Sequence, residues 1–330
     1  MNLKQAHKLS IIFSFRNEAD VLPELIKRVR AALKDRRTLE FISNYELIFV
    51  NDASTDHSLD ILLKESERDN DIRIITMSRR FGVTPCVLAG MEFSSGDLVI
   101  YMDADLQDPA EVIPELLTVW ASEENIDVVH TLRQSRKGES AVKLFLTRLG
   151  YLILNKTAAI PLPVEAGDFK LLSRRAVNHL LHIREKRPFL RGLICWIGFK
   201  QKFLPYHRDR RYAGRTKFSV LSGDVINNFL ESALISFSSL PLKIAFLVGF
   251  FAIILDLALL VHVLLEKIQG KAIPGWTAIM IAVIFAGSVQ LFCLGIIGLY
   301  INAIYEESKG RPNYIIESTF GFPSSSQKQS

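Results

Sequence analysis

The sequence has few cysteines and none of the common glycine-rich phosphate motifs. Its three cysteines, Cys86, Cys195 and Cys293, lie far apart in the 330-residue chain, so neither a disulfide framework nor a zinc site is indicated. It contains no G-x-x-x-x-G-K-[ST] motif, and no G-x-G-x-x-G motif after the first predicted strand. A P-loop and a Rossmann dinucleotide site are therefore not expected. The first residues, MNLKQAHKLSIIFSF, have too short an apolar run for a secretory signal.

Charge and hydropathy are unevenly distributed along this chain of net charge +5. Residues 1–240 are mixed and charged, whereas residues 242–305 are mostly apolar. Residues 242–265 and 277–305 are each long enough to cross ~30 Å of hydrocarbon. Two crossings place both flanks on one side, which the positive-inside tendency makes cytoplasmic. We therefore expect a multi-pass protein of the inner (cell) membrane.

This pattern divides the chain into four expected regions. Residues 1–216 form a cytoplasmic catalytic domain, and residues 242–305 form two transmembrane helices with a short non-cytoplasmic loop. Between them, residues 217–241 carry apolar residues at roughly helical spacing, which is typical of amphipathic helices in the membrane interface. A helix in the core of the domain is the alternative interpretation. Residues 306–330 form a cytoplasmic tail.

Short apolar strands alternate with helices in the first hundred residues. The strands are expected at 8–15, 45–50, 72–77 and 98–102, and the helices at 21–33, 58–68 and 85–93. This alternation predicts an α/β fold with a doubly wound, mostly parallel sheet.

Polar side chains follow three of these strands. Asn17 and Glu18 follow the first, Asp52 follows the second, and Asp103 and Asp105 follow the fourth, in the stretch LVIYMDADLQD. The carboxyl ends of parallel strands meet at one edge of a sheet, where ligands bind. Two carboxylates there suit Mg²⁺ or Mn²⁺, completed by substrate phosphates. The alternative is an acidic turn that caps the next helix, with Pro109 in its first turn.

A series of motifs gives this pattern a family resemblance. In order, they read SFRNEAD, VNDASTD, SRRFG, DADLQDP and GDFKLL. The series resembles the family 2 inverting glycosyltransferases of GT-A fold. More narrowly, it is similar to the polyisoprenyl-phosphate glycosyltransferases, such as dolichol-phosphate mannose synthase and the bacterial GtrB and ArnC types.

The resemblance implies a role for each group of residues. Nucleotide contacts are expected from Phe15, Asn17, Glu18, Asp52, Arg79, Asp103 and Ala104. A metal, Mg²⁺ or Mn²⁺, is expected on Asp103, Asp105 and Gln107, and the catalytic residues are expected to be Asp168 and Asp105. The acceptor phosphate is expected to contact Arg133, Arg136, Lys137, Lys170, Arg191, Arg208, Arg211, Thr216 and Lys217. For the basic stretches that hold these cations, the alternatives are a solvated charge run and a patch that attracts lipid headgroups.

Two departures from the family pattern bear on these roles. Ser14 and Arg16 stand where the family has Pro-x-Tyr, which affects the base-stacking contact. Lys170 stands where the family has arginine, so the charge is kept but the bidentate fork is lost. A phosphate monoester has a second pKa near ~6 and needs little general-base help. We therefore expect Asp168 to position the acceptor or to orient Lys170; the alternatives are a helix N-cap and a structural ion pair.

The sequence thus predicts transfer of glucose from UDP-glucose to undecaprenyl phosphate, with the membrane and a second copy of the chain as further partners and no nucleic acid. The same reaction with UDP-GlcNAc, a UDP-4-amino-arabinose derivative, UDP-galactose or GDP-mannose is one alternative. A non-enzymatic membrane scaffold or flippase component is another. A processive polysaccharide synthase is disfavoured because the chain has no Q-x-x-R-W element.

Overall fold

The computed structural model describes residues 7–134, 166–186, 188–209, 240–269 and 275–322. The chain forms two compact units. The described part of the first unit, the catalytic unit, holds all the strands and shorter helices together with the segment after Arg311. The described part of the second holds two long helices.

A mixed sheet runs through the catalytic unit, and in the described residues its strand order is β7-β5-β6-β4-β1-β2-β3-β8. The strands are β1 (His7–Phe15), β2 (Ile42–Asn51), β3 (Ile72–Met77), β4 (Leu98–Asp103), β5 (Val128–Arg133), β6 (Ala166–Ser173), β7 (Gln201–Tyr206) and β8 (Ile316–Phe320). The four strands expected from the sequence are present and parallel. The α/β prediction is confirmed, but the sheet is mixed, because β6 and β8 pair antiparallel to their neighbours.

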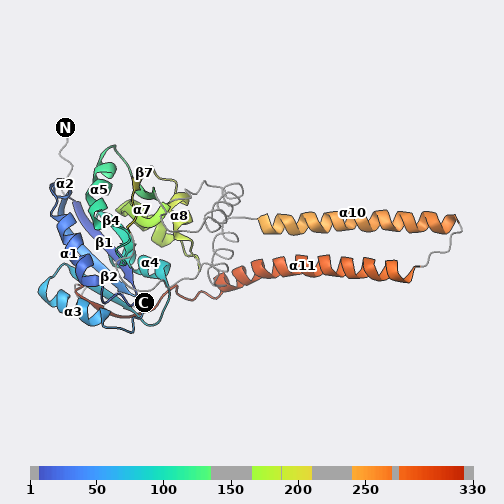
Figure 1. The fold of residues 1–330 in the computed structure, drawn as a ribbon, viewed down its shortest axis with the longest axis horizontal. Helices are drawn as coiled ribbons and strands as arrows, with labels where there is room; N and C mark the ends of the chain where they lie inside the picture. Colours follow the sequence, from blue (N-terminus) through green and yellow to red (C-terminus); the bar gives the residue numbers. More distant parts are fainter. Residues whose placement is uncertain (1–6, 135–165, 187, 210–239, 270–274, 323–330) are drawn as a thin grey trace. The chain divides into compact units, whose positions relative to one another are not determined.

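Helices cover both faces of this sheet. They are α1 (Leu22–Leu33), α2 (Arg36–Leu39), α3 (Ser58–Arg68), α4 (Val83–Phe93), the 3₁₀ turn η1 (Ala110–Val112), α5 (Ile113–Ala121), α7 (Arg174–His182) and α8 (Leu190–Trp196). In Figure 1, α1 and α3 lie on one side of the central strands, and α4, α7 and α8 lie on the other. The three helices expected from the sequence are found, with first residues that differ by at most a turn.

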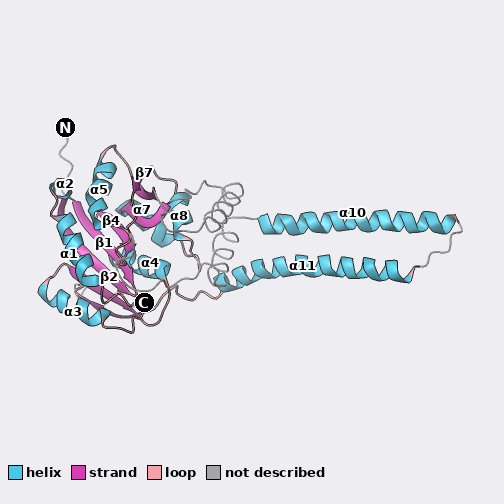
Figure 2. Cartoon of the chain, in the orientation of Figure 1, coloured by secondary structure: helices cyan, strands magenta, loops and turns pink. Residues whose placement is uncertain are grey.

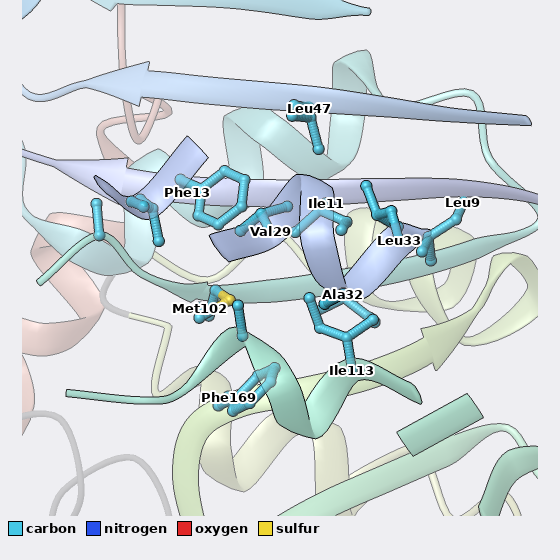
Figure 3. Packing of buried hydrophobic residues seen from close by; sticks show 14 of the residues in the cluster. Leu9, Ile11, Phe13, Val29, Ala32, Leu33, Leu47, Met102, Ile113 and Phe169 are labelled. Atoms are coloured by element: carbon cyan, nitrogen blue, oxygen red, sulfur yellow. The ribbon is translucent and has the colours of Figure 1, made fainter. Parts of the chain in front are cut away.

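Alternate residues of the strands form the main hydrophobic core. Leu9, Ile11 and Phe13 of β1 are fully buried and pack with Val29 of α1 and Phe169 of β6 (Figure 3). The side chains between them point to the other face, which α4 covers. A Cβ added at Gly90 of α4 would lie 2.4 Å from Cγ2 of Ile12, so this helix lies close against β1. Strand alternation places Tyr101 and Asp103 of β4 on this second face.

The second unit contains α10 (Leu240–Ile268) and α11 (Trp276–Ser308), drawn as two uninterrupted helices in Figure 2. Of the described residues, Ala282–Ser308 alone form a helix long and apolar enough to cross a membrane, and Ile244–Leu255 form a shorter apolar segment. Both predicted helices are therefore present, and one of them meets the length and hydropathy of a span. The expected juxtamembrane helices at 217–241 lie almost entirely outside the described residues.

The segment after α11 belongs to the catalytic unit. Here β8 pairs antiparallel with β3 at the sheet edge. Two side-chain bonds precede this strand: Asn313 Nδ2 donates to the Glu185 carbonyl at 2.7 Å, and the Tyr314 hydroxyl donates to Glu92. The predicted tail at 306–330 thus contains a strand of the sheet, which the sequence analysis did not expect.

Candidate active site

Three parallel strands end at the same edge of the sheet. The register pairs Phe15 with Asn51 and pairs Ser14 with both Val50 and Asp103. The loops that follow β1, β2 and β4 are therefore neighbours, as the sequence pattern predicted. At this edge the Ser14 hydroxyl donates to Asp103 Oδ1 at 3.5 Å.

Hydrogen bonds join the loops that the sequence assigned to the nucleotide. Asn17 accepts from the Thr55 backbone N–H at 2.8 Å and donates through its side-chain Nδ2 to the Thr55 hydroxyl at 3.2 Å. The Glu18 backbone N–H donates to Ser58 Oγ at 2.9 Å. These bonds connect the loop after β1 to the loop after β2 and the start of α3, so both loops are held in one arrangement.

Asp52 connects these loops to the turn after β3. Its carboxylate accepts from the backbone N–H of Phe81 at 2.6 Å and from that of Gly82 at 3.1 Å. Arg79 is exposed in the same turn, and its guanidinium lies 4.1 Å from the centroid of the Phe81 ring. Phe15 has a different setting, because its ring is buried in the core against Phe49. A contact between the Phe15 ring and a nucleotide base thus finds no support in this geometry.

The same loops contain residues with an unfavourable backbone conformation. In the described residues, four residues other than glycine have positive φ, and three of them, Asn17, Ala53 and Leu106, lie in the loops that follow β1, β2 and β4. A positive φ is unfavourable for a side-chain-bearing residue, and such strain persists where the surroundings fix it, often at functional sites. The strained loops therefore mark the strand ends as the candidate site, independently of the motifs.

The loop after β4 presents its polar side chains on one side. Asp103, Asp105 and Gln107 are partly exposed, whereas Ala104 and Leu106 between them are buried. Asp105 Oδ1 accepts from the Gln107 backbone N–H at 3.1 Å. No side-chain cap is found at η1, the next helical turn. The carboxylates thus do not cap that turn, and the alternative interpretation of this motif is not supported.

The electrostatics of this loop fit a bound cation. Burial, and then the negative charges of Asp168, Asp105 and Asp108, raise the pKa of Asp103 to about 7, although Arg208 opposes the shift. A divalent ion would offset this repulsion, and carboxylate and amide oxygens are the ligands that Mg²⁺ and Mn²⁺ prefer. No group of three or more His, Cys, Asp or Glu side chains in the described residues could hold a metal alone. Asp103, Asp105 and Gln107 offer oxygen ligands of the kind that suits such an ion.

Strand β6 brings Asp168 to the same place. Tyr101 of β4 pairs with Lys170 of β6, and continuing this antiparallel register by two residues places Asp168 opposite Asp103. Arg191 of α8 holds the Asp168 carboxylate in a bidentate pair, with Nε 2.7 Å from Oδ1 and a second bond from Nη2 to Oδ2. Burial alone would raise the pKa of Asp168, but the charge and hydrogen bonds of Arg191 lower it to about 2. Asp168 is therefore ionised throughout the neutral range.

A second polar network lies beside the metal loop. Asp108 is fully buried; it accepts from the Tyr206 hydroxyl and, at 3.1 Å, from Nε of Arg208. Arg133 Nε donates to the Tyr206 hydroxyl at 3.4 Å. The backbone N–H of Asp209 also donates to the Gln107 carbonyl at 2.9 Å. Two of the predicted acceptor cations, Arg133 and Arg208, thus belong to one network with Tyr206 and Asp108, and Arg208 also lies close enough to Asp103 to oppose the rise of its pKa.

Residues 10–181 match the model of glycosyl transferase family 2. This match covers more than half of the chain. The protein belongs to glycosyl transferase family 2.

Relatives align with this glycosyltransferase along nearly its whole length. An uncharacterized glycosyltransferase of Synechocystis is 36% identical over 95% of this chain and 96% of its own. A bactoprenol glucosyl transferase of Shigella phage SfV is 31% identical over 94% of this chain and 98% of its own. At these coverages the similarity extends beyond the catalytic unit into the two long helices.

Among solved structures, a mannosyltransferase of Pyrobaculum calidifontis in complex with GDP-Man and Mn²⁺ matches with a TM-score of 0.46 and 15% identity. The match covers 93% of this chain and 76% of that chain. A score below 0.5 does not establish a shared fold, so nothing in that complex transfers to this glycosyltransferase.

Five of the predicted acceptor residues lie outside the described residues of the glycosyltransferase: Arg136, Lys137, Arg211, Thr216 and Lys217. Lys170 is described and is fully buried, so its environment differs from that expected of a phosphate contact. Neither Asp108 nor Tyr206 was expected from the sequence to have a role in the site. Asp108 lies within the DADLQD motif, but its hydrogen-bond partners, Tyr206 and Arg208, lie at and just beyond the end of β7, a strand that the sequence pattern did not predict.

Proposed function

We propose that this glycosyltransferase moves glucose from UDP-glucose to undecaprenyl phosphate on the cytoplasmic face of the membrane. The observation that carries the proposal is the juxtaposition of two carboxylate sites: Asp168 lies close enough to Asp103 for its charge, after burial, to raise the pKa of Asp103, which agrees with the β4–β6 register continued beyond its last pair. One site suits a metal-bound diphosphate, and the other lies among the cations Arg191, Arg133 and Arg208. The names of the relatives support the choice of glucose and of bactoprenol, the undecaprenyl carrier.

The donor half of the site is formed by the loops after β1, β2 and β3 and by the metal loop. Asn17, Glu18 and Asp52 lie where a nucleoside would meet the strand ends. Asp103, Asp105 and Gln107 would hold Mg²⁺ or Mn²⁺, which supplies Lewis-acid stabilisation of the leaving diphosphate. The bond from the sugar C1 to this diphosphate breaks, and UDP leaves with the bonding electrons.

The acceptor half binds a lipid phosphate. A phosphate oxygen attacks the sugar C1 from the face opposite the leaving group, which gives an inverted, β-linked product. The phosphate is largely dianionic at neutral pH, and a carboxylate of pKa about 2 is a poor proton acceptor there. Asp168 therefore fixes Arg191 toward the acceptor instead of removing a proton. The positive charges of Arg133 and Arg208 offset the repulsion between the two phosphate-bearing substrates.

Transfer by the purified full-length protein in detergent tests this function. UDP-[¹⁴C]glucose, undecaprenyl phosphate and Mg²⁺ or Mn²⁺ should give a radiolabelled lipid, and EDTA should abolish its formation. Asp105→Asn should reduce the rate by about 100-fold or more, because it removes a charged ligand of the diphosphate-bound ion. The matched control is Asp97→Asn, the same change at the exposed, opposite end of β4, which should retain transfer.

The same assay separates the alternatives. A panel of UDP-GlcNAc, UDP-galactose, a UDP-4-amino-arabinose derivative and GDP-mannose identifies another donor by competition and by labelled product. Absence of metal-dependent transfer to any polyprenyl phosphate would reject the enzymatic proposal in favour of a scaffold or flippase component. Such a component would also keep its cellular role in the Asp105→Asn variant.

A further inference from the structure

Three buried polar side chains form a row across the sheet behind Asp168. Lys170 of β6 pairs in register with Tyr101 of β4 on one side and with His130 of β5 on the other. Lys170 and His130 are completely buried, and Tyr101 is 1% exposed. Lys170 is two residues from Asp168 on the same strand, so both side chains point to the same face of the sheet.

Each of these side chains has a polar atom that no described residue satisfies: the Lys170 ammonium nitrogen Nζ, the Tyr101 hydroxyl and Nδ1 of His130. Buried polar atoms are normally paired, and an unpaired buried charge is the most costly exception. Three such atoms lie on one row of neighbouring strands, and each requires a hydrogen-bond partner.

The hydrogen bonds around Gln201 define what His130 requires. Nε2 of Gln201 donates to the carbonyl of Ile194 at 3.0 Å and to that of Cys195 at 3.4 Å. Its Oε1, which can only accept, lies 2.7 Å from Nε2 of His130, so the His130 proton is on Nε2. Nδ1 then carries a lone pair. Burial, and then the charge of Lys170, lower the pKa of His130 to about 3, so Nδ1 stays an acceptor at neutral pH.

The three atoms together suit water. Lys170 offers only donors, Nδ1 of His130 needs a donor, and the Tyr101 hydroxyl can do either. A water molecule accepts from the ammonium or the hydroxyl and donates to the imidazole, and buried waters typically make about three such bonds. A direct bond between Lys170 and His130 would satisfy two of the atoms, but the structure shows none among the described residues.

We propose that Lys170, His130 and Tyr101 form a buried water site, and that Lys170 held there is a positioning residue for the Asp168–Arg191 pair. The ammonium lies behind Asp168, whose carboxylate it attracts from the buried side while Arg191 holds it from α8. The link between Lys170 and the acceptor depends on the proposed function. This positioning role takes the place of the direct phosphate contact expected from the sequence, because the completely buried ammonium exposes no surface to a lipid headgroup.

The first test needs no activity. The melting temperatures of wild type, Lys170→Met, His130→Phe and the double variant form a cycle, in which phenylalanine preserves the stacking on Phe203. A shared water makes the effects non-additive: Lys170→Met lowers the melting temperature less in the His130→Phe background. Additive effects would overturn the site.

An experimental density map at high resolution tests the water site directly. Density within hydrogen-bond distance of all three atoms supports the site, and a direct bond from Lys170 to a protein group rejects it.

The second test concerns positioning. Lys170→Met should lower kcat/KM for undecaprenyl phosphate by about 10- to 100-fold and leave the affinity for UDP unchanged. Tyr101→Phe should change the same parameter less, because it removes one hydroxyl. The control is Thr38→Val, which removes a buried hydrogen bond to the Ala32 carbonyl away from this site and should leave the acceptor kinetics unchanged. An equal loss in Thr38→Val would reduce Lys170 to a structural role. If the wild type transfers sugar to no lipid phosphate, the proposed function fails, while the melting cycle still decides the water site.

Discussion

Asp168 carries its negative charge in a bidentate pair with Arg191, and this pairing limits what the carboxylate can do. With its pKa lowered to about 2, it does not titrate between pH 5 and pH 9. We predict that Asp168→Asn lowers the transfer rate by about 100-fold, since the acceptor loses its orientation, and that the pH–rate profile keeps its shape. Rates of wild type and variant across this pH range are the measurement.

Arg191→Lys provides the companion variant, because it keeps the charge but removes the two-point grip. It should also lower the rate without moving the profile. A limb that titrates in the wild type and disappears in Asp168→Asn would instead identify Asp168 as a general base.

The candidate site shows what the sequence could reveal at this scale. Asp103 and Asp105 stand at or just beyond the end of an apolar strand, a position that is readable without a structure, whereas Asp168 was expected from the GDFK motif of the family resemblance alone. His130, Tyr206 and Glu46 lie within strands, and their partners come from other strands. Their importance depends on register, which a single sequence does not determine.

Glu46 is the clearest buried charge far from the site. Its carboxylate accepts from Ser10 Oγ at 2.5 Å and from the Ser95 backbone N–H at 2.7 Å, and it pairs with Arg73 and Lys8. Burial alone would raise the pKa of Glu46, but these hydrogen bonds and charges together lower it. The folded-state pKa is thus below the unfolded one, so the carboxylate stabilises the fold above the unfolded pKa, and this contribution is lost as the pH falls through the folded value.

We therefore predict that Glu46→Gln destabilises the protein at pH 7, by about 3 kcal/mol, since it removes the buried charge that pairs with the partly buried cations Arg73 and Lys8. The difference in melting temperature between wild type and variant should shrink as the pH falls below about 4. Thermal unfolding in detergent at several pH values measures it. A difference that is independent of pH would show that packing, and not charge, is lost.

At the scale of elements, β8 connects the segment after α11 to the donor loops. It pairs with β3, and the Ser78 backbone N–H, at the start of the Arg79–Gly82 turn, donates to the Ile315 carbonyl at 3.0 Å. Strands β1 to β4 were predictable because each is a local apolar run between turns. The pairing of β8 was not, since it joins residues far apart in the sequence, and the run YIIESTF alone does not indicate its partner.

We predict that truncation after Pro312, which removes β8, weakens UDP binding by about 10-fold. Loss of the Ser78 bond and its neighbours costs roughly 1 kcal/mol per hydrogen bond and loosens the turn held by Asp52. Titration of UDP against the purified variant measures the effect. Truncation after Phe322 keeps β8 and is the control. Equal affinities in the two truncations would show that the strand does not support the donor site.

At the scale of the whole molecule, the connectivity of the two units restricts the topology in the membrane. The chain enters α10 from the catalytic unit, and β8, after α11, belongs to that same unit. A single sheet can lie on only one side of a bilayer, so we expect α10 and α11 to make an even number of crossings in any membrane that they enter. If Ala282–Ser308 crosses the membrane, as its length and hydropathy allow, then α10 must cross as well, although its apolar segment Ile244–Leu255 is shorter.

We predict from this that Gln269, at the end of α10, faces away from the cytoplasm and that Ser308, at the end of α11, faces it. Single cysteines at these positions, in a Cys293→Ser background that leaves only the buried Cys86 and Cys195, are treated in whole cells with a membrane-impermeant maleimide. The cysteine of Gln269→Cys should react in intact cells, and that of Ser308→Cys only after permeabilisation. Protection of both until permeabilisation would mean that neither helix crosses and that the pair lies along the cytoplasmic surface. Reaction of both in intact cells would contradict the shared sheet, because β3 and β8 cannot then lie on the same side as a cytoplasmic donor site.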